Sequence, residues 1–155
     1  MVYKRKSWAE KLADKKNFPK ILKLEPRFPC SKLLMKLGAK PGDSVVLAQP
    51  SEVVKIMNKV PKGKLITIKE VCGQLAKNHK VKWCCPLTTG IFIVIAANAA
   101  VETKNKLPWW RTLKMNGELN PKCPKGQKRL LEVEGHKIIK KGQRSFVKDY
   151  EENLI

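Results

Sequence analysis

Acidic residues are scarce in this sequence of 155 residues, which has 13 Asp and Glu against 33 Lys and Arg and a formal net charge of +20. Self-repulsion of this size destabilises a compact chain unless an anionic partner offsets it, and nucleic acid is the commonest such partner. A very soluble or a ribosome-associated protein can have the same charge. The composition therefore favours a nucleic-acid partner, and charge alone does not distinguish DNA from RNA.

Patterns of metal ligands are also missing. The two histidines, His79 and His136, lie far apart, and no Cys-x-x-Cys pair or Cys/His cluster has the spacing of zinc ligands. The five cysteines are an odd number, and the opening stretch MVYKRKSWAEKLADKK has no apolar segment typical of a secretory signal. We therefore expect reduced thiols, no metal and no cofactor in a cytoplasmic protein, which in a prokaryote would be associated with the nucleoid.

Long apolar runs are absent as well. The longest, residues 90–101 (GIFIVIAANAAV), is well short of a membrane span and contains Asn98. It is expected in a core or a groove, and a membrane is not an expected partner. The length and the hydrophobic content of 43% indicate one globular domain with basic extensions, which we expect to be a monomer.

The middle of the chain predicts two consecutive helices. Residues 43–50 are typical of a strand and residues 50–60 of a helix, and Thr67 is the expected N-cap of an amphipathic helix that follows it. After a loop, Thr88 or Thr89 is expected to cap a second helix that continues to about Ala100. A helix, loop and helix of this length is the outline of a helix-turn-helix.

The second of these helices is unusual because no Lys or Arg occurs between Trp83 and Thr103. It therefore lacks the basic side chains that read base edges in a major groove. Its residues Ile91, Val94 and Ile95 are expected in the core. The alternative is that the small side chains of residues 96–100 (AANAA) let the helix approach a minor groove closely.

The C-terminal third predicts short β elements around one more helix. Asn116-Gly117 favours a type I′ hairpin, residues 125–135 a helix closed by Gly135, and residues 136–150 a small basic hairpin or wing. The expected fold class is mainly α with short β elements, arranged as a winged helix-turn-helix.

Four motifs occur in an order and spacing that resemble a known family: VPKGKLITIKEV, TTGIFIVIAANAA, LPWWRTLKMNGEL and RLLEVEGHKI. Residues 44–142 resemble the DNA-binding C-terminal domain of the O6-alkylguanine-DNA alkyltransferases. Residues 1–43 are then a basic N-terminal extension or a reduced subdomain, and residues 143–155 a C-terminal tail. Residues 1–43 contain two short amphipathic segments, which would either pack on the core or form a basic arm along the DNA backbone.

The resemblance implies which residues stand at the family's reactive site. Between Pro108 and Arg111, Trp109 stands where the family has its acceptor cysteine and Trp110 where it has its histidine. Glu134 matches the glutamate that supports this histidine, and here it is expected to have no partner or to be a surface carboxylate. Ile68 replaces the tyrosine that helps to rotate the target nucleotide. Phe92 falls near the arginine finger, either as a wedge in the base stack or as a core residue.

The substitution at Trp109 decides the expected chemistry. Direct reversal of an alkylated guanine needs an activated thiolate to accept the alkyl group, which an indole cannot do. The chain resembles the alkyltransferase-like proteins, which also have tryptophan at this position, bind alkylated DNA without repairing it and flag it for excision. The resemblance thus implies a non-enzymatic protein with no catalytic residue, whose partners are duplex DNA containing O6-alkylguanine and excision-repair proteins.

Two groups of site residues follow from this resemblance. The expected DNA-binding residues are Thr88, Thr89, Phe92, Asn98, Lys104 and Arg111, and the expected lesion pocket consists of Ile68, Trp109, Trp110 and Glu134. The alternatives are a winged-helix protein with a regulatory or architectural role and no lesion recognition, and an active methyltransferase with a displaced cysteine. Cys84 and Cys85 are the candidates for the latter because they precede a helix N-terminus, which can lower the pKa of a thiol.

Overall fold

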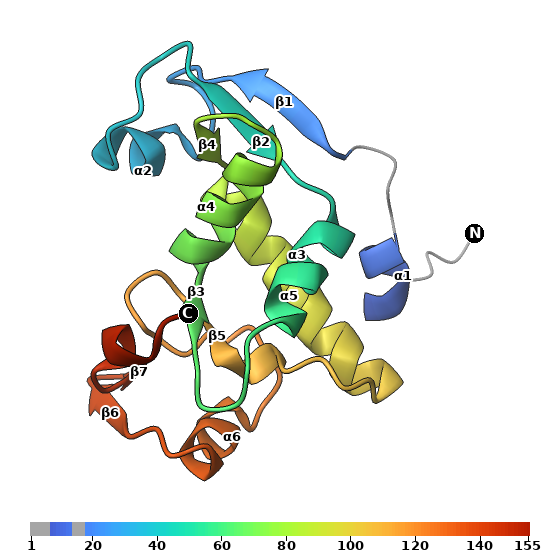
Figure 1. Cartoon of the computed structure of the whole chain (residues 1–155), viewed down its shortest axis with the longest axis vertical. Coiled ribbons are helices and arrows are strands. Elements are labelled where there is room, and N and C mark those ends of the chain that lie inside the picture. Colours follow the sequence, from blue (N-terminus) through green and yellow to red (C-terminus); the bar gives the residue numbers. More distant parts are fainter. Residues whose placement is uncertain (1–6, 14–17) are drawn as a thin grey trace.

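The computed structural model describes residues 7–13 and 18–155, and its elements alternate between helices and short strands (Figure 1). Its described helices are α1 (Trp8–Ala13), α2 (Ser31–Lys36), α3 (Pro50–Asn58), α4 (Ile68–Asn78), α5 (Pro86–Thr103) and α6 (Gln127–Val133). The strands are β1 (Lys20–Lys23), β2 (Ser44–Leu47), β3 (Ile66–Thr67), β4 (Trp83–Cys84), β5 (Thr112–Leu113), β6 (Ile138–Lys141) and β7 (Arg144–Val147). The fold is therefore mixed, with helices around small sheets, and the winged helix-turn-helix arrangement stays a prediction.

Helix α5 is the centre of the core, and α1, α3 and α4 pack against it (Figure 1). Its small and apolar side chains, among them Ile93, Ala96, Ala97 and Ala100, are almost fully buried. By length and composition alone α5 could cross a membrane, but half of its residues are buried inside the protein. The apolar composition therefore serves the packing of three helices around a fourth.

Local sequence signals determine where α4 and α5 begin. Thr67 is the N-cap of α4 as expected, and its backbone N–H donates to the Glu70 carboxylate at 2.9 Å in a capping box. The expectation that Thr88 or Thr89 caps α5 is wrong, because α5 begins at Pro86 with Cys85 as its N-cap. Proline has a fixed φ that suits the first helical position, and it holds the preceding residue in extended conformation.

The N-terminal region packs on the rest of the chain. Strand β1 pairs antiparallel with β2, which pairs in parallel with β4, so that residues 20–23 and 83–84 flank one central strand. Helix α1 lies against α5, and the backbone N–H groups of Trp8 and Ala9 donate to Glu102 on α5. The described residues of this region therefore pack on the core, and the domain division stays a prediction. Residues 1–6 and 14–17, which belong to the expected basic extension, lie outside the described residues.

The C-terminal region contains the expected helix and hairpin. Gly135, with φ of 94°, ends α6 at the position that favours a left-handed residue. Strands β6 and β7 pair antiparallel, and the expected domain boundary after residue 142 falls within the turn between them. The predicted type I′ turn is wrong, because Gly117 has a positive φ but Asn116 does not. The Asn116 side chain instead accepts a hydrogen bond from the Glu118 N–H at 3.3 Å.

Candidate nucleic-acid interface

The two adjacent tryptophans lie in a short 3₁₀ helix, Trp109–Arg111, between the end of α5 and β5. Trp109 is 5% exposed and belongs to the main core cluster with residues of α3, α4 and α5. The ring of Trp110 meets that of Trp109 edge to face, with 6.1 Å between the ring centroids. Trp109 therefore occupies a space in the core, where its burial contributes to stability, and it is not exposed to a free ligand.

Arg111 and Glu134 form a buried ion pair beside these rings. The Arg111 Nε donates to Glu134 Oε1 at 3.0 Å and its Nη2 to Oε2 at 2.6 Å, while Nη1 donates to the Val60 carbonyl at 2.8 Å. The guanidinium also lies over the Trp110 ring, 5.3 Å from its centroid. Burial alone would raise the pKa of the Glu134 carboxyl, but the hydrogen bonds and charge of Arg111 outweigh it and lower the pKa.

This ion pair corrects two expectations. Glu134 has a partner, and its side chain is 6% exposed, so it is neither unpaired nor a surface carboxylate. Arg111 is 13% exposed and donates inward from all three nitrogens, so its donors are not free for a phosphate. Through Arg111, the end of α6 is joined to Val60, which follows α3, and to the Trp110 ring.

Ile68 is the first residue of α4, and Phe92 lies in the first half of α5. Phe92 is 7% exposed and packs edge to face on Phe18, with 5.1 Å between the ring centroids. Phe92 is therefore a core residue, as one of the two expectations had it, and its ring is not available as a wedge. Ile68, the first residue of α4, is half-buried. Its Cδ1 atom would lie 3.6 Å from a Cβ atom placed at Gly90 of α5. The helix starts therefore approach each other closely at Ile68 and Gly90.

The remaining expected DNA contacts are divided between structural and exposed positions. Thr89 is buried and donates to the Cys85 carbonyl at 2.8 Å, and Thr88 is half-buried and donates to the Cys85 sulfur at 3.4 Å. Asn98 donates to the carbonyls of Val94 and Lys122, which ties α5 to the loop before α6. Lys104, at the C-cap of α5, is exposed. Of these four residues, Lys104 is the one whose side chain is free to meet a phosphate.

Sequence reasoning missed the apolar side chains that α5 exposes. Ile91, which we expected in the core, is 59% exposed, and Leu87, one turn earlier, is 44% exposed. Residues four apart share a helix face, so these two form one apolar ridge near the start of α5. Lys69 of α4 and Pro86 of α5 line one cavity, which places a basic side chain near this ridge.

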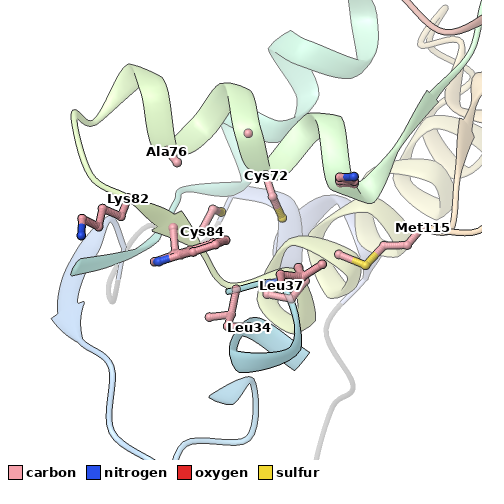
Figure 2. A pocket seen from close by; sticks show the side chains of 11 residues that line it. Leu34, Leu37, Cys72, Ala76, Lys82, Cys84 and Met115 are labelled. Atoms are coloured by element: carbon pink, nitrogen blue, oxygen red, sulfur yellow. The ribbon is translucent and has the colours of Figure 1, made fainter. Parts of the chain in front are cut away.

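Four cavities in the described part of the chain are lined by residues other than the two adjacent tryptophans. One lies between α3 and α4, one beside residues 118–128 and one near Tyr150. The fourth, of about 280 Å³, lies between α4, β4 and α2 (Figure 2). None of these four has Ile68, Trp109, Trp110 or Glu134 in its wall, so none of them is the expected lesion pocket.

The fold of this chain is similar to that of two solved structures of alkyltransferase-like proteins. The first is S. pombe Atl1 in complex with damaged DNA containing O6-carboxymethylguanine, with 18% identity, a TM-score of 0.51 and coverage of 68% of this chain and 93% of that chain. The second is S. pombe ATL in complex with DNA, with 17% identity, a TM-score of 0.52 and the same coverage. No protein-family model and no curated protein sequence matches the chain. The expected resemblance in fold is therefore confirmed.

Proposed function

We propose that this chain binds duplex DNA without catalysing a reaction on it. The observation that carries the proposal is the shared fold, since both similar structures are complexes with DNA and are covered over 93% of their length. The net charge of +20 supports it, because lysines and arginines release counterions when they neutralise phosphates.

The proposed contact surface is the start of α5. The ridge of Leu87 and Ile91 is apolar and solvent-exposed, and side chains of this kind contact the floor of a minor groove or unstack a base step. Lys69 and Lys104 are exposed on α4 and at the end of α5, where they can neutralise phosphates. The ridge, in place of the buried Phe92, thus supplies the apolar contact.

The absence of catalysis rests on the residues at the tryptophan site. An indole has no thiolate to accept an alkyl group, and Arg111 holds Glu134 in an ion pair, so this carboxylate is not a free base. The five cysteines lie elsewhere in the sequence, at positions 30, 72, 84, 85 and 123. Incubation with DNA that carries a radiolabelled methyl group should leave no covalent label on the protein. A stoichiometric label on Cys84 or Cys85 would instead identify a displaced acceptor.

Two forms of DNA binding differ in what they require of Trp109. Recognition of O6-alkylguanine, with excision-repair proteins as partners, is supported by the complex of Atl1 with O6-carboxymethylguanine. It requires Trp109 or Trp110 to move, because an extruded base needs a pocket. Binding that does not distinguish modified from unmodified DNA requires no movement of either tryptophan, and the 5% exposure of Trp109 favours this form. A regulatory or architectural role corresponds to this second form.

The decisive experiment is binding to matched duplexes with and without one O6-methylguanine. A preference of about tenfold or more for the modified duplex supports lesion recognition. One base that is contacted in one duplex and not in the other changes the binding free energy by about 1–3 kcal/mol. Equal affinity supports lesion-independent binding. In either form the affinity should fall by orders of magnitude between roughly 50 and 200 mM salt. No binding to either duplex at low salt overturns the proposed function.

A pair of variants locates the surface. Ile91→Ser removes an exposed apolar side chain from the proposed ridge, and Val133→Ser removes one that is 73% exposed on α6. We expect Ile91→Ser to weaken duplex binding by about tenfold, as for the loss of one good contact, and Val133→Ser to leave it unchanged. Equal effects of the two variants would place the DNA on another face.

A further inference from the structure

Two adjacent cysteines stand at the junction of β4 and α5, and each meets a cysteine from a different part of the chain. Cys84 belongs to the main core cluster together with Cys72 of α4. Cys85 belongs to a second cluster together with Cys30, which precedes α2. Neighbouring residues of an extended segment point to opposite sides, so one dipeptide places two separate thiol pairs.

The pair Cys72 and Cys84 differs from the pair Cys30 and Cys85 because both of its residues line a cavity. This cavity, of about 280 Å³, has mostly apolar walls from α2, α4 and the β4–α5 junction. Figure 2 shows the Cys72 side chain pointing from α4 toward the space between α4 and α2, with Leu34 and Leu37 on the opposite side. A small neutral molecule can therefore reach thiols that are otherwise buried in the core.

The two thiols of this pair do not share their proton equally. A hydrogen bond from Cys72 lowers the pKa of Cys84, and Thr89 adds to this, while burial and the charge of Glu52 on α3 oppose it. The hydrogen bond to Cys84, and then burial, raise the pKa of Cys72. Cys84 is thus the member of the pair that ionises first, at the N-terminus of an 18-residue helix whose dipole also favours an anion.

We propose that Cys72 and Cys84 form a modification site for small hydroperoxides, at which Cys84 is oxidised first and Cys72 then closes a disulfide. The order follows from the position of Thr89, whose hydroxyl oxygen lies 3.2 Å from the Cys84 sulfur. Cys72 lines the same cavity and belongs to the same core cluster as Cys84, so that a resolving thiol is already nearby.

The reaction balances with the peroxide as the only oxidant. The Cys84 thiolate attacks one peroxide oxygen, the O–O bond breaks, and the leaving oxygen takes a proton to give water or an alcohol. The Cys72 sulfur then attacks the sulfenic acid of Cys84, the S–O bond breaks, and hydroxide leaves as water with the Cys72 proton. Two thiols and one peroxide thus give one disulfide, with the sulfurs oxidised by two electrons and the peroxide reduced by two.

The second thiol pair provides an internal comparison. Burial and then the hydrogen bond to Cys85 raise the pKa of Cys30 to about 12, which leaves little thiolate at neutral pH. Neither Cys30 nor Cys85 is in the wall of the cavity that exposes Cys72 and Cys84. Oxidation should therefore be selective for one of two pairs that share a dipeptide.

The test uses the full chain, hydrogen peroxide and intact-mass measurement without reductant. We expect a loss of about 2 Da, a crosslinked Cys72–Cys84 peptide after proteolysis, and reversal of both by dithiothreitol. Cys30→Ser should still form this crosslink. Cys72→Ser should lose it and leave a sulfenic acid on Cys84 that dimedone traps. An unchanged mass, or a crosslink between Cys30 and Cys85, overturns the proposal.

Thr89 is a positioning residue in this proposal, and its neighbour is a matched control. Its single hydroxyl hydrogen serves the Cys85 carbonyl while Cys84 is a thiol, and it can turn to the Cys84 sulfur once that is a thiolate. Thr89→Val should slow disulfide formation at neutral pH and move its pH profile to higher pH. Thr88→Val, which removes a contact to Cys85, should leave the profile unchanged. A profile that neither or both variants move contradicts the assignment of Cys84 as the first thiol.

Discussion

The tryptophan site and the thiol site at the start of α5 differ in whether they contain groups that can react. At the tryptophan site, where the resemblance implies a reactive cysteine and histidine, the structure has two indoles and a buried ion pair. At the start of α5, two thiols, Cys72 and Cys84, line a cavity of about 280 Å³. The tryptophan region is filled by side chains, whereas the region at the start of α5 keeps open space next to groups that can react. A similar fold therefore does not by itself imply the chemistry of the expected site.

In the filled region, which consists of Trp109, Trp110, Arg111 and Glu134, each side chain supports the burial of another. A buried guanidinium requires partners for its donors, and it finds them in Glu134 and the Val60 carbonyl. The indole of Trp110 covers the guanidinium face, and Trp109 fills the core beneath it. If this account holds, substitutions in the filled region cost much stability, and those in the cavity cost little.

Trp109→Ala should have the largest effect. Removing a side chain that is 5% exposed leaves a large void, and we expect a loss of about 3–5 kcal/mol in the free energy of unfolding. Trp110→Ala should cost less, because Trp110 is only half-buried. Urea denaturation measures both. A folded Trp109→Ala protein of normal stability that has lost only its preference for O6-methylguanine would instead make Trp109 the wall of a lesion pocket.

Glu134→Gln should come second, at about 3 kcal/mol. The change removes the charge that Arg111 needs and leaves a guanidinium that is 13% exposed without an anion. Glu132→Gln, on the exposed side of α6, is the matched control and should change stability little. The double change Arg111→Met with Glu134→Leu should cost less than the sum of its parts, because no unpaired charge remains. Additive losses would mean that the ion pair does not act as a unit.

The pH dependence of stability should also come from the filled region and from His136. Burial lowers the pKa of His136, although the charge of Glu134 opposes this, and its Nε2 atom has no hydrogen-bond partner in the described part of the chain. The folded state therefore disfavours the protonated ring, and stability falls as the pH drops through 6.5, the ordinary histidine value. His136→Leu should flatten this slope. A further loss should follow below the ordinary pKa of Glu134, 4.5, because its folded pKa is lowered. Denaturation midpoints measured between about pH 8 and 4 test the loss from His136 and the start of the loss from Glu134.

The sequence predicted the elements that depend on neighbouring residues. Thr67 caps α4 through Glu70, and Gly135 ends α6, because these signals act within one helical turn. The start of α5 differs from the prediction because Pro86 occupies the first helical position, so the two threonines after it lie inside the helix. The partner of Glu134 could not be predicted, since Arg111 lies 23 residues away and the two meet only in the folded chain.

The exposed face of α5 shows a different limit of prediction. A helix with apolar residues on all sides has no polar face from which to infer its orientation. Ile91 and Phe92 are adjacent and both apolar, yet Ile91 is 59% exposed and Phe92 7%. The packing of α1, α3 and α4 decides which residue turns outward, and the sequence of α5 alone does not contain that information.

The smallest expected effect concerns the cavity, where a substitution should stabilise the protein. Gly73 lies within α4 and lines the cavity, and a Cβ atom added to it meets nothing within 4 Å. Alanine in a helix interior loses less conformational entropy than glycine, so Gly73→Ala should raise the free energy of unfolding by about 0.5–1 kcal/mol. Gly126→Ala is the control. Its Cβ atom also meets nothing within 4 Å, but its φ of 102° is strained for alanine, and the change should be destabilising. If Gly73→Ala is destabilising as well, the space beside Cys72 and Cys84 is not open, and the contrast between the two regions fails.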